Sequence, residues 1–336
     1  MSDAQATVIA AVISLCGAAA SVAVAAFNPF AARNLERLKT ELAKQFARSS
    51  ARIEYEFEAR KRLYAEFEPL LFQLGEATEG AYYRVVSLVR TQKAGKLGAA
   101  PQSWLSEGRG GSVGPRYYAT STIYLLFLPL VIYRLIQRSA TFFDLSLDAD
   151  IRTKYYLLKA AAVLLTDDYE IAKVAPALEY EPSRTDWATA RLTASATIWR
   201  QGLVIGHLEQ FLDAMIIVEG AQRRPMTFGE FQAAVTGGKA EFLDAYEPAA
   251  DILRDFSFDT RPVLGRILLA YAVLMDLLSR TYASLPPRSE MEAAVDIFAN
   301  SDKAKDILEW CPDPVKNGWG ATIPYLKQHL GWVYKR

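Results

Sequence analysis

The chain is poor in the residues that build metal and redox sites. Its 336 residues include only two cysteines and two histidines. Cys16 and Cys311 lie near opposite ends of the chain, and no C-x-x-C pair or cluster at metal-ligand spacing occurs. This absence argues against a zinc site, a redox pair and a disulfide framework. The sequence therefore predicts no metal and no cofactor.

Convergent catalytic residues are also lacking. His207 sits in the apolar segment GLVIGHLEQFL, which is typical of a satisfied core histidine and not of a general base. Ser112 lies in GGSVG, which matches the nucleophile-elbow pattern, but a Gly-rich loop with no strand before it is the wrong context. The loop also lacks the Gly-Lys-Ser/Thr ending of a Walker motif. We therefore expect no catalytic residue and no enzyme activity.

Acidic residues occur in patterns that have structural explanations. Asp144, Asp148 and Asp150 are expected to cap helices, because aspartate is a common N-cap residue. Asp167 and Asp168 are expected to lie in a solvated turn. Basic and acidic residues balance to a net charge of zero, so long-range attraction of the whole chain to nucleic acid is not indicated.

Charge is absent altogether from one segment near the N-terminus. Residues 6–27, ATVIAAVISLCGAAASVAVAAF, run for twenty-two positions without a charged side chain. A helix of that length measures roughly 33 Å, enough to cross a hydrocarbon core of about 30 Å. No Lys or Arg precedes the segment, which disfavours a cleaved signal peptide, and it shows no polar face suited to a core helix. We therefore predict a transmembrane helix in residues 1–30.

The charges that follow this segment predict its orientation. Two glutamates accompany six basic residues, which are Arg33, Arg37, Lys39, Lys44, Arg48 and Arg52. Basic flanks stay on the cytoplasmic side of a membrane. We therefore expect a single-pass protein of the cell (inner) membrane with a cytoplasmic C-terminal body.

The predicted span also carries small residues at a spacing of four. One row is Gly17, Ser21 and Ala25, and a second is Ala10, Ser14 and Ala18. Such rows let helix backbones approach closely, although an Ala-rich helix also contains them by chance. We expect these rows to pack copies of the span together in a homo-oligomer.

A long helical pattern fills residues 31–92. The first helix is expected to break at Asn28–Pro29, and Pro69 is expected to kink or restart the second. Apolar residues recur mostly three or four positions apart, at Leu35, Leu38, Leu42, Phe46, Ile53, Phe57, Leu63 and Phe67. This pattern favours a coiled-coil-like stalk that associates with other copies. The alternative is an amphipathic helix folded back on its own body.

The remaining chain reads as a loop followed by helices. Residues 93–116 are rich in glycine and predict a flexible loop. Residues 117–336 show helical periodicity between Pro and Gly breaks, with no clean period-two strand, so the predicted fold class is all-α. The uncharged run 117–133 is expected to be a buried core helix, with a second membrane span as the alternative.

Three basic residues are candidates for ligand binding. Arg223 and Arg224 precede Pro225, and Lys239 follows a Gly-Gly pair. Arginines near aromatic side chains suit a nucleotide or a single-stranded nucleic acid. Basic residues at helix ends also serve as ordinary caps for the helix dipole. Spacing alone leaves both interpretations open.

The whole-chain plan is a bare N-terminal span, a basic flank, an imperfect coiled stalk and a helical body without catalytic residues. This plan resembles the Hailong-type membrane effectors of bacterial anti-phage defence. The resemblance implies an oligomeric membrane protein held inactive by a nucleic-acid ligand. It also implies a companion nucleotidyltransferase that makes the ligand, whose loss opens an ion-conducting pore. It transfers no binding residue to any position of this chain.

These features favour a homo-oligomeric membrane effector that forms a pore or disrupts the membrane. A ligand bound to the body would control it, because a ligand can bias two arrangements of an assembly. The alternative is a membrane-tethered α-helical scaffold that recruits a soluble partner. A hydrolase built around Ser112 is the third and least favoured hypothesis.

Overall fold

The computed structural model describes residues 3–99, 103–105, 116–140, 144–175, 177, 200–220 and 222–331. Within the helices, the side chains of residues 3–13, 16, 17, 19, 20, 23–32, 35 and 140 lie outside the description. The chain divides into two compact units, Met1–Lys61 and Arg62–Arg336. Most of the predicted loop, including Ser112, lies outside the described residues.

A single helix, α1, occupies the first quarter of the chain. It runs from Asp3 to Lys93 over 91 residues and continues across the division between the two units. The predicted break at Asn28–Pro29 and the predicted restart at Pro69 are therefore wrong. A proline inside a helix removes one hydrogen bond and costs about 3 kcal/mol. Near Pro69, burial of Phe67 and Leu74 against the body offsets that cost.

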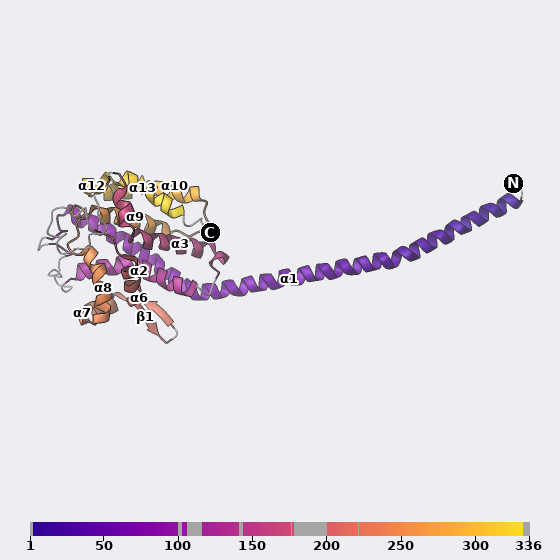
Figure 1. Cartoon of the computed structure of the whole chain (residues 1–336), viewed down its shortest axis with the longest axis horizontal. Coiled ribbons are helices and arrows are strands. Elements are labelled where there is room, and N and C mark those ends of the chain that lie inside the picture. The colour runs from indigo at the N-terminus through magenta and orange to yellow at the C-terminus, as the bar shows by residue number, and fades with distance from the viewer. Residues whose placement is uncertain are drawn as a thin grey trace. The chain divides into compact units, whose positions relative to one another are not determined.

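The rest of the described chain is mostly helical, as predicted. Its helices are α2 Tyr117–Ala140, α3 Ala149–Leu164, α4 Asp168–Lys173, α6 Ile205–Ala214, α7 Phe228–Gly237, α8 Ala240–Leu253, α9 Pro262–Leu278, α10 Arg288–Ala299, α11 Asp302–Glu309, α12 Asp313–Lys316 and α13 Trp319–Leu330, with a 3₁₀ turn η2 at Leu145–Leu147. Figure 1 labels most of these elements within the body.

A small β-hairpin departs from the predicted all-α fold. Strands β1, Ile216–Glu219, and β2, Gln222–Pro225, pair antiparallel with Ile216 opposite Pro225. Gly220 begins the turn at φ 63°, a conformation that glycine adopts without strain. Strands of four residues are too short to show a period of two in the sequence, which explains why the pattern missed them.

Helix α9 forms the centre of unit 2. All but one of its residues are buried, as expected of a helix that is apolar on every side. It packs against α3, α4, α10, α12 and α13 (Figure 1). A second group of contacts joins α2 to α6, α7, α8 and strand β2, and α3 touches both α2 and α9. Helix α3 therefore connects the two halves of the core.

Among the residues that the structure describes, one helix is long and apolar enough to cross a membrane, and it is α2. Most of its length, from Tyr117 to Ser139, is buried inside the body. The phenol of Tyr271 on α9 donates to the Leu126 carbonyl at 2.6 Å, and the Arg134 guanidinium donates to Asp213 on α6 at 2.8 Å. These contacts agree with the predicted core helix.

The C-terminal part of α1 belongs to the same core. Leu63, Phe67 and Leu74 are buried, and the hydroxyls of Ser87 and Thr91 each lie 3.1 Å from the Tyr118 phenol on α2. Leu63 and Phe67, the last residues of the predicted apolar pattern, are therefore covered by the body.

Candidate functional site

Before residue 61, α1 exposes large apolar side chains. Five of those after residue 33 recur four or seven positions apart and are 56–74% exposed: Leu38, Leu42, Phe46, Ile53 and Phe57. We call this set the apolar stripe. Tyr55, 70% exposed, lies off this row. Scattered exposed apolar residues are ordinary, but a row along one helix indicates an interaction surface. The stripe is therefore the candidate functional site of this chain.

Charged side chains surround the apolar stripe. All six basic residues of the predicted flank are exposed, and Glu36 and Glu41 lie among them. Arg52 donates to Glu56 one turn later at 2.9 Å. Exposed pairs of this kind stabilise a helix by about 0.3–0.5 kcal/mol. Residues 33–61 thus combine a helical backbone, an uncovered apolar face and a largely charged remainder.

The predicted membrane span lies in the helical N-terminal part of α1. Ser14, Ala18 and Ser21 are exposed, as are the larger Leu15 and Val22 at 76% and 68%. Of the remaining small residues, Ala10, Gly17 and Ala25 have side chains outside the description. The helical conformation of the charge-free run is confirmed, whereas its insertion into a membrane stays a prediction.

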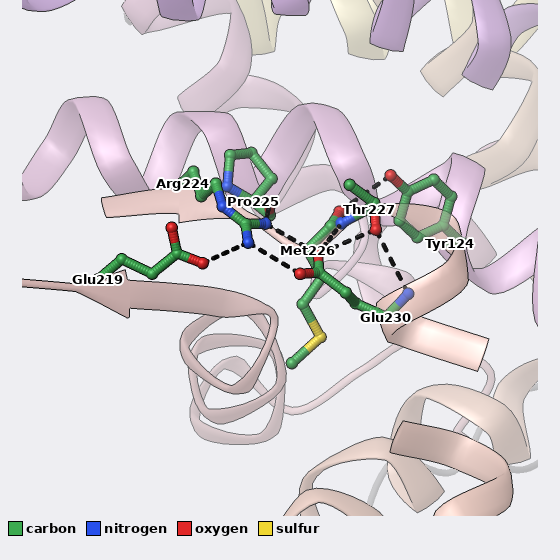
Figure 2. A network of polar contacts seen from close by, with 7 residues as sticks. All are labelled: Tyr124, Glu219, Arg224, Pro225, Met226, Thr227 and Glu230. Carbon is green, nitrogen blue, oxygen red and sulfur yellow. Dashed lines mark hydrogen bonds and ion pairs between the residues drawn. The ribbon is translucent and has the colours of Figure 1, made fainter. Parts of the chain in front are cut away.

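The three predicted ligand-binding residues occupy different structural settings. Arg224 lies on β2 between two carboxylates, 2.5 Å from Glu219 and 2.8 Å from Glu230 (Figure 2). Its two terminal nitrogens bind both oxygens of Glu230, the bidentate geometry that arginine favours. Arg223 is the next residue along the strand and therefore points to the opposite face. Lys239 precedes α8 and is exposed.

Glu230 also closes the start of α7. Its carboxylate accepts from the Thr227 backbone N–H at 2.8 Å, and the Thr227 hydroxyl accepts from the Glu230 N–H at 3.3 Å, which forms a capping box. The hydrogen bonds from Arg224, and then those from Thr227, lower the pKa of Glu230 to about 2. The Tyr124 phenol of α2 donates to the Met226 carbonyl at 3.0 Å (Figure 2).

Arg224 therefore joins β1, β2 and α7, and its charge is balanced by two carboxylates. An anionic ligand would have to displace Glu219 or Glu230 to bind it. The ligand-binding hypothesis for Arg223 and Lys239 stays a prediction.

The acidic residues singled out by the sequence have mixed outcomes. Asp144 and Asp148 accept backbone N–H bonds as the predicted N-caps. Asp168 was predicted to be solvated, and this is wrong: it is fully buried. Its Oδ2 accepts the backbone N–H groups of Gln201 and Gly202 at 2.8 Å each. Asp168 therefore fixes the backbone of residues 201 and 202, which precede α6.

His207 also departs from its predicted setting. The side chain is exposed on α6, whereas its neighbours Leu208, Phe211 and Leu212 are buried. The periodicity placed the helix correctly but gave His207 the wrong face. The buried histidine is His329, whose ring stacks on Tyr325 with centroids 5.6 Å apart. Burial lowers the pKa of His329, although Asp167 opposes that shift.

No cluster of three or more His, Cys, Asp or Glu side chains that could hold a metal occurs among the described residues. Cys311 is a buried thiol whose pKa burial raises to about 12. A thiol in that state is a weak nucleophile at neutral pH. The absence of enzyme activity remains a prediction.

Comparisons with known protein families, with curated proteins and with solved structures find no match to this chain.

Proposed function

We propose that this chain is a membrane-anchored effector that acts as a homo-oligomer and perturbs the membrane under control of its helical body. The observation that carries the proposal is α1. One uninterrupted helix contains the charge-free run 6–27 and then the uncovered apolar stripe. The first feature suits a hydrocarbon environment and the second suits a protein partner.

Oligomerisation is necessary for this function. A single helix cannot enclose a conducting path, so several copies must contribute one span each. The small-residue rows in the span favour close helix packing in lipid. The basic residues 33–52 favour a cytoplasmic body, where a ligand would reach it.

The resemblance to Hailong-type effectors extends the proposal to anti-phage defence. The ligand would then be a nucleotide or a single-stranded nucleic acid made by a companion enzyme. Ligand binding would shift the equilibrium between a closed and an open arrangement of the assembly. The size of the shift would be set by the difference between the ligand's affinities for the two arrangements.

Leakage from liposomes tests the proposal. The purified full-length protein is reconstituted into vesicles loaded with a self-quenched dye, and the matched control carries an unrelated single span in place of residues 1–30. We expect dye release with the natural span and loss of release with the replacement. A scaffold would leave the vesicles intact with either span while still reaching the membrane. That outcome would contradict the effector function.

A further inference from the structure

Most of the apolar stripe repeats at eleven residues. Phe57 follows Phe46 by eleven positions, and Ile53 follows Leu42 by the same interval, whereas Ser49 follows Leu38. A seven-residue interval joins only one pair of the stripe, Phe46 and Ile53. The eleven-residue period therefore describes the stripe better than a heptad.

The period determines how two such helices wind around each other. Eleven residues in three turns correspond to about 3.67 residues per turn, slightly more than the 3.6 of a straight helix. A heptad repeat gives a left-handed supercoil, whereas an eleven-residue repeat gives a right-handed one. Helices joined through the apolar stripe would therefore wind with a shallow right-handed twist.

Charges at the two edges of the apolar stripe are complementary in one arrangement. With an advance of about 98° per residue, Lys39 and Glu54 fall on one edge, and Glu41 and Arg52 fall on the other. All four side chains are exposed. In a parallel pair without stagger, Lys39 of one copy meets Glu41 of the other. Glu54 lies opposite both Arg52 and Glu56 of the other copy, which are paired with each other at 2.9 Å. Opposite charges therefore face each other without competition at the level of Lys39 and Glu41.

We propose that the apolar stripe is covered by the same stripe of a second copy of this chain, parallel and in register, in a right-handed coil. The proposal rests on the proposed membrane anchoring, because spans that enter one bilayer in the same direction make their following helices parallel. It adds the face, the direction and the register of the contact, which the proposed function leaves open.

Disulfide cross-linking of the full-length chain in membranes tests this geometry. The natural cysteines are first replaced, as Cys16→Ala and Cys311→Ser. Single cysteines are then placed on the stripe, as Leu42→Cys, Phe46→Cys, Ile53→Cys and Phe57→Cys, and at positions of a heptad begun at Leu38 and Leu42, as Gln45→Cys, Arg52→Cys and Glu56→Cys. After mild oxidation, we expect the stripe set to yield at least several-fold more cross-linked dimer than the heptad set.

Three results would overturn the proposed contact. A higher yield at positions 45, 52 and 56 would show a left-handed heptad coil. Dimers formed only when two different stripe positions are combined would show an antiparallel or staggered pair. An oligomer of unchanged mass with no cross-link at any of these positions would place the contact on another face while leaving the proposed function intact. Loss of membrane association and of the oligomer together would instead refute the proposed function.

A lipid-facing stripe is the remaining outcome, and it also contradicts the proposal. A polarity-sensitive fluorophore on Phe46→Cys distinguishes the two environments in vesicles with a quarter anionic lipid. We expect quenchers carried on lipid chains to leave its emission unchanged. Strong quenching together with absent cross-links would show that the stripe lies on the membrane surface.

Discussion

Arg266 is the most deeply buried basic side chain among the described residues of the body. Only 1% of its surface is exposed, in the middle of the apolar helix α9. Its guanidinium donates to the carbonyls of Pro314 at 2.9 Å and Val174 at 3.1 Å, and burial lowers its pKa. Arg266 thereby joins α9 to Val174, just after α4, and to Pro314 in α12. A buried cation is tolerated when backbone carbonyls replace its hydration shell.

Gly318 makes room for this guanidinium. A Cβ atom at position 318 would overlap Nε and Cζ of Arg266, although the φ of −76° suits any residue. We expect Gly318→Ala to displace Arg266 from its carbonyls and to lower the free energy of unfolding by about 2–3 kcal/mol. Chemical denaturation of the detergent-solubilised protein measures the change.

The matched control for that substitution is Gly320→Ala, inside helix α13, which Gly318 precedes as the N-cap. No atom lies within 4 Å of a Cβ at position 320, and alanine favours a helix over glycine by up to about 1 kcal/mol. The control should be neutral or stabilising. Equal losses for both variants would contradict the role assigned to Gly318.

At the scale of single elements, the hairpin depends on one arginine. Arg224 connects β1 to the start of α7 through Glu219 and Glu230, and both strands are only four residues long. Isolated two-stranded hairpins are marginally stable in water. The ion pairs and the bond from Tyr124 therefore hold the hairpin against the body.

Arg224→Gln should loosen the hairpin without unfolding the body. We expect the backbone amides of residues 216–220 and 222–224 to exchange their hydrogens severalfold faster, while the thermal midpoint changes little, because exposed ion pairs add little to global stability. The control is Arg223→Gln on the opposite strand face. Equal exchange in the two variants would refute the special role of Arg224.

The sequence predicts an element well when the interactions that fix it join residues close together along the chain. The helices of the body and the buried position of α2 follow from local periodicity. Asp168 shows the limit, because its partners lie 33 and 34 residues further along the chain. No local pattern at Asp168 distinguishes a buried acceptor from a solvated turn.

The candidate site was partly visible in the sequence. The apolar residues from Leu35 to Phe67 form one pattern there, and the structure separates the exposed stripe from the buried Leu63 and Phe67. Arg224 was found as a basic residue near a break, but its two carboxylates come from different elements. Local proline rules also failed at Pro69, where tertiary packing outweighs the lost hydrogen bond.

At the scale of the whole molecule, two features of α1 explain the proposed behaviour. The charge-free run suits an apolar environment, and the apolar stripe suits a protein partner. A homo-oligomer in a membrane satisfies both with one helix per chain. A monomer in water would leave both features exposed over residues 6–57.

The mass of the full-length chain extracted from bacterial membranes shows whether α1 both anchors the chain in lipid and joins it to other copies. Cells expressing the protein are fractionated, the membrane fraction is transferred to lipid nanodiscs, and the mass of the intact complex is measured. The account predicts that the unprocessed chain is found in the membrane fraction as a multiple of its 37.3 kDa. Recovery of the intact chain as a water-soluble monomer would contradict it.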